Sequence, residues 1–437
     1  MATKIWRGDA VAVSQVNHIT IAGTWANTEA VTVKINDVSG NQVKAFKLTV
    51  DNVAGRTVEE VVDAIISAWN SGTQDASFLL DKNVSEAGEL AAITASKSGT
   101  TIVVLTADTP GVPFVQTSTE DAAAGTAVTT IPTDSSGPNH WDDAGNWFLP
   151  GGVAAAPIAA DSVYIQDTDV DILYGLNQTA IKLALLQVDA SFTGTIGLPR
   201  DNTSGVAYRE YLPQYLDIRA DAIRIGDGLG QGSGRIKLNV PTAASDITVL
   251  STGSPLEQDR KSLLLRSMII GGSLTVRGGS VEVCPHGGDT AIVTTLNASG
   301  SADVRIGVGT TLTTSNASGT ATVEINVAVA TRLEMQDNPT VTVQGSGTVA
   351  IANVFGGTIN YLGTGTITTL LVGAGGIFDA SNNPVGATVS SAVTATSGST
   401  IKDPNQVINF SAGVTYQNCG IDEVAANYGR GFTVTLS

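Results

Sequence analysis

Alternating carboxylates are the clearest candidate for chemistry in this sequence. Asp167, Asp169 and Asp171 are separated by single residues, so on a β-strand they would share one face and offer oxygen ligands to a hard cation. The run lacks the glycine and the later glutamate of an EF-hand loop. We therefore expect a solvated acidic ridge, and the sequence predicts no metal and no cofactor.

Glycine-rich and histidine-containing stretches are weaker candidates. Glycine occupies every second position of 226–234, but no Lys-Ser/Thr pair follows, so we predict a tight corner and no nucleotide site. His18 and His140 lie far from any cysteine, whereas His286 is two positions from Cys284. A pair without further ligands does not predict a metal site. No nucleophile elbow is present, and a Ser-His-Asp arrangement stays open.

Arg235-Ile236-Lys237 resembles the Arg-Ile-Lys triplet of the polygalacturonase-like glycosidases. That family also carries paired aspartates and a Gly-His-Gly on neighbouring coils, because glycoside hydrolysis needs an acid and a base across the sugar bond. Here Gly-His-Gly is missing, and the single Asp-Asp pair, Asp142-Asp143, lies far upstream. We predict that the triplet is a strand with outward-pointing charges.

Composition narrows the class of partner. The 437 residues carry a net charge of −17, with 14% charged and 5% aromatic residues and 48 glycines. Binding to nucleic acid or to an anionic membrane needs clustered Lys and Arg, so neither partner is expected. Cys284 and Cys419 are too few for a disulfide framework. Because no apolar leader segment opens the chain, we expect synthesis in the cytoplasm.

A repeat dominates residues 161–420. The segment 313–319 restates 294–300 nineteen positions later, and the strand-like runs 304–306 and 323–325 keep that offset. Short β-branched runs at a period near 20, separated by glycines, are typical of a parallel β-solenoid. At one strand spacing per turn we expect about 13 turns and a rod about 60 Å long.

Residues 1–130 predict a separate α+β module. Thr57 and Glu60 form a capping box ahead of a helical apolar stripe. The expected elements are a hairpin of 31–35 and 45–50, a helix over 57–70, and a second hairpin of 90–96 and 101–106. This order, closed by Pro110-Gly111-Val112-Pro113-Phe114, resembles small modules of tailed-bacteriophage structural proteins. The resemblance implies a role in assembly or attachment. The predicted fold class is therefore mainly β, a small α+β module followed by a parallel β-solenoid (β-helix).

Residues 131–160 predict a linker and the start of the solenoid. Trp141 and Trp147, followed by a Gly/Pro stretch and Asp161-Ser162-Val163, resemble the start of the β-solenoid in bacterial surface and phage-encoded repeat proteins. Two indoles can cover a first coil that otherwise exposes an apolar end and unpaired strand edges. We predict that these two residues are a structural cap.

Two interruptions of the repeat are candidate surfaces. Tyr208, Tyr211 and Tyr215 form the densest aromatic patch, and insertions in solenoids map to loops on one face, often the binding face. They could bind a glycan or a neighbouring subunit, or only pack a loop onto the rod. The charged stretch 256–270 predicts a short helix or a longer protruding coil, and residues 421–437 predict a C-terminal cap or tail.

These observations favour a non-enzymatic structural protein of a tailed bacteriophage, either a capsid decoration or a fibre or spike component. The module would attach to capsid or tail proteins of the virion, the solenoid would project, and copies would form a homo-oligomer such as a trimer. A host surface glycan is a further candidate partner. The alternatives are a bacterial surface adhesin or surface-layer component, and a tailspike-like polysaccharide depolymerase that would use Asp217 and Asp221.

Overall fold

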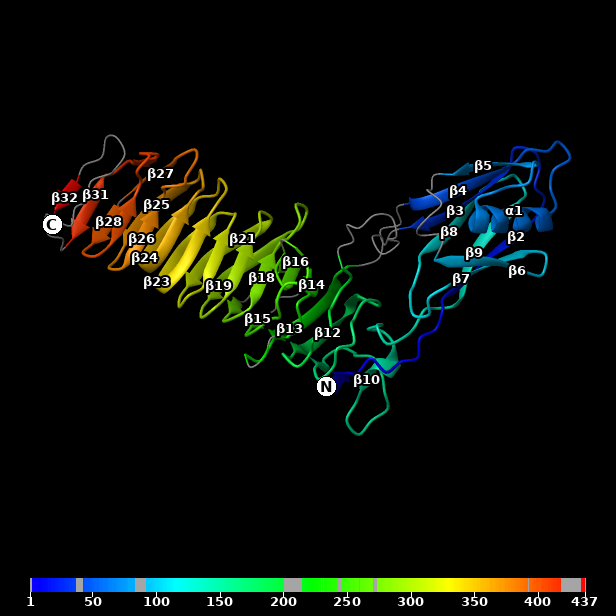
Figure 1. Cartoon of the computed structure of the whole chain (residues 1–437), viewed down its shortest axis with the longest axis horizontal. Coiled ribbons are helices and arrows are strands. Elements are labelled where there is room, and N and C mark those ends of the chain that lie inside the picture. Colours follow the sequence, from blue (N-terminus) through cyan, green and yellow to red (C-terminus); the bar gives the residue numbers. More distant parts are fainter. Residues whose placement is uncertain are drawn as a thin grey trace.

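The chain folds into a small α+β module and a long parallel β-solenoid of about 11 turns, which confirms the predicted fold class (Figure 1). Strands make up 52% and helix 5% of this computed structural model. The structure describes residues 2–36, 42–82, 92–199, 214–228, 230, 232–241, 246–258, 260–269, 273–391, 393–417 and 434–436.

The solenoid strands stack in parallel along three faces, named here stacks A, B and C. Several strands bend at a corner and belong to two stacks, as β23 does by pairing with β21 and with β22. Stack A contains β1 (Thr3–Trp6), β11 (Ser162–Ile165), β15 (Asp246–Val249), β17 (Ser273–Val276), β28 (Val393–Thr396), β31 (Val414–Gln417) and β32 (Val434–Leu436).

Stack B contains β18 (Ser280–Val283), β20 (Asp303–Ile306), β22 (Thr322–Ile325), β26 (Gly376–Asp379) and β29 (Thr400–Lys402). Stack C contains β27 (Ala387–Val389) and β30 (Ile408–Phe410). The strands that turn a corner are β12 (Asn177–Val188), β13 (Leu216–Ile225), β14 (Ile236–Val240), β16 (Leu263–Ile269), β19 (Ala291–Ala298), β21 (Thr310–Ala317), β23 (Val329–Val343), β24 (Val349–Tyr361) and β25 (Thr366–Val372).

The register explains why the turns are fewer than the sequence repeat predicts. Asn297 pairs with Asn316, nineteen positions on, as the repeat requires. Earlier coils are longer, because Leu185 pairs with Ala222, 37 positions on, and Ile247 with Leu274, 27 positions on. The expected 13 turns are therefore corrected to about 11, which gives a rod of about 53 Å at ~4.8 Å per turn.

Aliphatic columns fill the solenoid interior. In stack B, Val304, Val323, Val341 and Ile359 lie side by side in successive coils, and each is at most 1% exposed. The side chain one position later points outward, since strand side chains alternate. Each coil thus buries apolar surface on both neighbours, and apolar burial contributes about 25 cal/mol per Å².

The described residues of the module form two four-stranded antiparallel sheets and one helix. One sheet has the order β6 (Ile93–Ser98), β7 (Ile102–Ala107), β2 (Val16–Ala22) and β9 (Thr126–Thr133), and the other β5 (Phe78–Lys82), β4 (Gln42–Val50), β3 (Ala30–Asn36) and β8 (Gln116–Asp121). The helix α1 (Val58–Ser71) begins with the predicted Thr57–Glu60 capping box and buries Val61, Ile65 and Trp69. The predicted helix and both hairpins are confirmed.

The chain begins inside the solenoid sheet and only then enters the module. Strand β1 pairs in parallel with β11, and the Ala2 amide donates to Asp161 Oδ1 at 2.8 Å. On its other side β1 pairs antiparallel with the short strand β10 (Trp147–Phe148), which follows the 3₁₀ turn Ala144–Asn146. Both ends of the module segment therefore lead back to the first coil, and β10 closes the edge that β1 would otherwise expose.

Three tryptophans fill the interior beside these first strands. Trp6, Trp141 and Trp147 are at most 1% exposed and belong to the continuous solenoid core. The Trp147 ring lies edge-on to Trp6 at 5.1 Å and to Trp141 at 4.8 Å between centroids. The Trp147 indole donates to the Trp141 carbonyl at 2.6 Å. Sequence reasoning missed Trp6, and the capping role of Trp141 and Trp147 stays a prediction.

The charged stretch 256–270 is not a helix. Its second half is strand β16, which pairs with β14 on one side and β18 on the other. Leu263 and Leu265 are fully buried at the inward positions of that strand. The expectation of a short helix was wrong for residues 263–269, because these leucines alternate with the two-residue period of a strand. The coil that contains the stretch is longer than the nineteen-residue repeat, since Ile247 pairs with Leu274, 27 positions on.

The Trp6→Ala substitution should destabilise the first coils by about 3–5 kcal/mol, since it removes a fully buried aromatic ring and leaves a cavity. Native-state hydrogen exchange at Val163 and Ile165 in β11 measures this cost locally. Phe148→Ala is the matched control, because Phe148 is 47% exposed and its loss should cost about 1 kcal/mol or less. Equal effects of the two substitutions would contradict the packing role of Trp6.

Candidate functional site

Charged side chains from several coils meet in one pocket on the solenoid. The cavity has a volume of about 260 Å³. It is lined by Gln214, Tyr215, Lys237, Glu257, Arg260, Leu264 and His286. In a chain of net charge −17, the described walls thus carry two cations and one carboxylate. Perturbed ionisable groups that gather in a cleft are a physical indication of a functional site.

Lys237 forms the buried floor of this pocket. The residue is only 2% exposed, so the prediction that the Arg235-Ile236-Lys237 triplet points its charges outward was wrong for Lys237. Its ammonium contacts Glu257 at 2.7 Å and donates to the Leu198 carbonyl at 2.9 Å. Burial lowers the Lys237 pKa, while Glu257 acts in the opposite direction. Such a buried charge persists only because both partners are in place.

Tyr215 and His286 form the second part of the pocket. The Tyr215 hydroxyl and His286 Nε2 share a hydrogen bond of 2.8 Å. Burial, and then the charge of Asp289, raise the Tyr215 pKa, so this phenol stays neutral. Partial burial lowers the His286 pKa, helped by the cations around it and opposed by Asp289. The pair is therefore neutral near pH 7.

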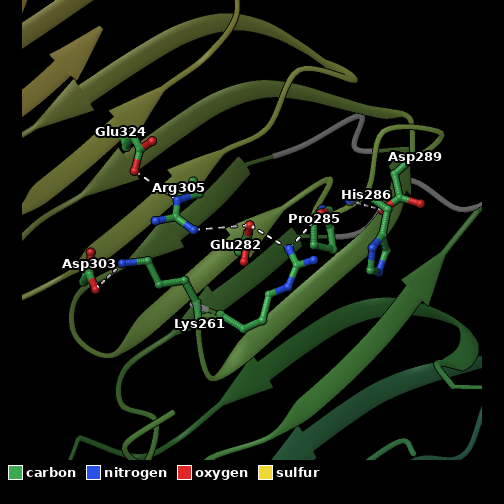
Figure 2. A network of polar contacts seen from close by, with 9 residues as sticks. Lys261, Glu282, Pro285, His286, Asp289, Asp303, Arg305 and Glu324 are labelled. Carbon is green, nitrogen blue, oxygen red and sulfur yellow. Dashed lines mark hydrogen bonds and ion pairs between the residues drawn. The ribbon is translucent and has the colours of Figure 1, made fainter. Parts of the chain in front are cut away.

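An ionic ladder leads away from the pocket along stack B (Figure 2). Arg260 contacts the Glu282 carboxylate at 3.4 Å and donates to the Pro285 carbonyl at 2.8 Å. Glu282 lies 3.6 Å from Arg305, which contacts Glu324 at 3.0 Å. Figure 2 shows Glu282, Arg305 and Glu324 in line on the successive strands β18, β20 and β22. Opposite charges in adjacent positions favour this register over a shifted one.

Arg266 and Asp289 complete the surroundings of Tyr215. The Arg266 guanidinium lies over the Tyr215 ring at 5.7 Å from the centroid, and its Nε donates to Asp289 at 3.1 Å. The Lys237 ammonium also lies over this ring, at 5.9 Å. Asp289 in turn accepts from the His286 backbone amide at 2.9 Å. Two cations are therefore held against a single neutral phenol.

The other predicted site residues are spread along the chain. Tyr215 lies in the pocket, whereas Tyr208 and Tyr211 fall outside the described residues. Asp217 accepts from the Asn239 amide, and Asp221 pairs with Lys182, so each of these two carboxylates has its own partner. Burial raises the Asp217 pKa.

The acidic run does not lie on a β-strand, so its carboxylates lack the shared strand face on which a cation site would depend. Asp167 and Asp169 lie outside the strands, and Asp167 has a positive φ of 55°. The Asp171 carboxylate accepts from the Thr195 amide and hydroxyl at 2.7 and 2.8 Å. Across the described ranges, no three His, Cys, Asp or Glu side chains cluster closely enough to hold a metal ion.

A Ser-His-Asp arrangement occurs where the module meets the solenoid. His140 Nε2 lies 3.3 Å from the Ser135 hydroxyl, and Nδ1 lies 3.8 Å from Asp142. However, Nε2 is also 2.9 Å from the Gly111 carbonyl, which can only accept. Nε2 therefore carries a proton in this contact and cannot take one from Ser135. The histidine ties the module to the first coil.

Comparison with known proteins gives no family for this chain, because it matches no protein-family model, no curated protein and no solved structure. Within the part of the chain that the structure describes, no helix is long and apolar enough to span a membrane.

Sequence reasoning missed most of the pocket. It noted Lys237 as an exposed strand residue, Glu257 and Arg260 as part of a protruding stretch, and His286 as a neighbour of Cys284. The residues that line the pocket span 72 positions, from Gln214 to His286. The irregular lengths of the early coils decide which residues meet, and no repeat in the sequence reveals them.

Lys237→Met should destabilise the protein by about 3–5 kcal/mol, since Glu257 loses its buried lysine and the Leu198 carbonyl loses a donor. Urea denaturation measures the change, and the double variant Lys237→Met/Glu257→Gln should recover part of it. Lys182→Met is the matched control, because its pairing with Asp221 is at the surface and should be worth about 0–1 kcal/mol. A cost equal to that of Lys182→Met would refute the role of the buried pair.

Acid should weaken the fold through His286. Its pKa in the folded chain lies below the ordinary value of 6.5, so below that pH the unfolded chain binds a proton that the folded chain does not. This contribution is absent well above pH 6.5, lowers the free energy of unfolding as pH falls from about 6.5 to the folded-state pKa, and is constant below that pKa. His286→Gln keeps a partner for Tyr215 and should reduce the loss of stability between about pH 7.5 and 5.5. Identical pH profiles of wild type and variant would count against this assignment.

Proposed function

We propose that this chain is a non-enzymatic structural protein of a tailed bacteriophage particle, a rod that serves as a capsid decoration or as part of a fibre or spike. The observation that supports this most strongly is the double connection between module and rod. The first strand of the chain, β1, lies in the solenoid sheet, and the chain returns to the same sheet at β10 after completing the module.

The contacts at this joint support a mechanical role for the rod. Val13 bridges Ser136, and His140 bridges Tyr174, whose ring lies 5.1 Å from the imidazole. Tyr174 and Leu198 of the solenoid also belong to the continuous apolar core of the module. A force applied to the module is then shared between strand pairing and a buried apolar interface, and neither connection acts as a flexible linker.

The ion pairs along the rod are consistent with the same structural role. Beyond the pocket, charged side chains of stack B are engaged in pairs between coils, as Lys402 is with Asp379 at 3.5 Å. Such pairs fix the strand register of a repeating rod. The partners of the module would be capsid or tail proteins of the particle. Because a symmetric particle offers repeated positions, copies of this chain would form a homo-oligomer such as a trimer.

The experiment is to locate the chain in purified particles by mass spectrometry and cryo-electron microscopy of the same sample. We expect many copies in symmetric positions, with the module against the particle and the solenoid directed outward. Absence of the chain from particles, together with its release from intact cells by surface proteolysis, would overturn this proposal in favour of an adhesin or surface-layer component. Cleavage of host polysaccharide that Asp217→Asn and Asp221→Asn abolish would instead establish the depolymerase.

A further inference from the structure

The sheet of the module with the order β6, β7, β2 and β9 turns one side to solvent. Its other side packs into the module core, where Ile19, Val103 and Leu105 are fully buried. Strand side chains alternate, so the residues between these point outward. The cross-strand register arranges the outward residues in three rows, together called the outer face: Ser98, Ile102, Thr20 and Val128; Ser96, Val104, His18 and Thr130; Thr94, Thr106, Val16 and Thr133.

None of the twelve residues of the outer face is Asp, Glu, Lys or Arg. The second sheet of the module has the charged outward side that is usual for a solvated sheet. There Lys47 and Asp121 pair at 3.6 Å, with side chains 43% and 85% exposed. On the outer face, by contrast, Val128 is 54% exposed, and Ile102 and Val104 are partly exposed. Exposed apolar side chains grouped on a face without such charges indicate a contact surface.

The chemistry of the outer face is complementary to a copy of itself. Its polar residues are Ser, Thr and His18, and a hydroxyl or a neutral imidazole can both donate and accept, so two such faces can hydrogen bond to each other. Because the chain carries a net charge of −17, two copies repel each other, and a contact without carboxylates adds least to that repulsion. Asp108, which accepts from the Thr94 hydroxyl at 2.6 Å, lies at the margin of the face.

The shape of the outer face indicates the same partner. Two β-sheets pack face to face with their strands about 30° apart, because both sheets twist with the same hand. A second copy presents a sheet of the same size, twist and side-chain pattern, and a two-fold axis makes one surface serve both partners. Val, Ile and Thr occupy nine of the twelve positions, and these β-branched residues suit the packed surface between sheets.

We propose that two copies of this chain associate through the outer face, sheet against sheet, about a two-fold axis. The face measures about 19 Å across its four strands and about 17 Å along them. Its area of about 320 Å² is below the ~800 Å² per partner of stable complexes, so the pair is weak, with a dissociation constant in the micromolar range or above. The pairing does not rest on the structural role of the rod, because it needs only the module.

Sedimentation velocity of the full chain, from low micromolar to several hundred micromolar, tests the proposal. We expect the weight-average mass to rise with concentration from the 44.6 kDa of one chain towards twice that mass. Val128→Glu should weaken the association about tenfold or more, because it brings like charges into the contact. Leu79→Glu is the matched control, since Leu79 is 56% exposed on strand β5 of the other sheet, and it should leave the association unchanged.

A charge-swap experiment identifies the partner as a second copy. The double variants Val104→Glu/Val128→Glu and Val104→Lys/Val128→Lys should each remain monomeric, because each face then repels its copy. An equimolar mixture of the two should associate, since their faces carry opposite charges. Circular dichroism and thermal unfolding establish that each variant is folded. The single variant Val128→Glu, at an exposed position, keeps the test decisive where a double variant does not fold.

Three outcomes overturn the proposal. A wild-type chain that sediments as a monomer over the whole concentration range would exclude the pair and leave the outer face to a different protein. Equal weakening by Val128→Glu and Leu79→Glu would place the contact elsewhere. A mixture of folded double variants that stays monomeric would show that the face does not meet its own copy. None of these outcomes bears on whether the chain is found in particles, so the two proposals fail separately.

Discussion

The pairing of β1 with β11 is the contact on which the rest of the structure depends. Residues 3–5 hydrogen bond in parallel to residues 162–164, across the entire module segment. That pairing starts stack A, brings Trp6 against Trp147, and returns both ends of the module to one place. Once the first coil is complete, each later coil has a template of matching strands, which is how solenoids propagate order through nearest-neighbour contacts.

Beyond the first coil, two kinds of column hold the rod. Inward-pointing columns of Val and Ile bury apolar surface between the coils. Outward-pointing polar columns fix the strand register, as Asn297 and Asn316 do through an amide hydrogen bond of 2.9 Å. The pocket departs from this scheme, because Lys237 is buried with a charge where a coil would gain more from an aliphatic side chain. The buried charge of Lys237 costs stability, and the repeat does not require it. Such positions are expected at functional sites, so the pocket around Lys237 is a candidate binding site.

The regular elements of this fold could be predicted from the sequence, whereas the irregular early coils could not. The nineteen-residue restatement at 294–319, the Thr57 capping box and the module hairpins all depend on neighbours in the chain or on an exact repeat, so they could be predicted. Strand β1 has no local signal for a partner 159 residues away. From the sequence, Lys237 is predicted to be a surface residue of a strand. Its partners, Glu257 and the Leu198 carbonyl, are brought to it by the early coils of 37 and 27 residues, which no repeat in the sequence predicts.

The module is fixed to the rod by two connections and a buried joint. Distances between spin labels at Thr73 on the module and Ala180 on the solenoid test it most directly, because both positions are exposed. Cys284 and Cys419 would first be replaced by serine. A fixed joint predicts one narrow distance distribution in solution, unchanged by binding of a partner to the rod. A broad distribution would contradict it, since it would mean that the module swings freely on a linker.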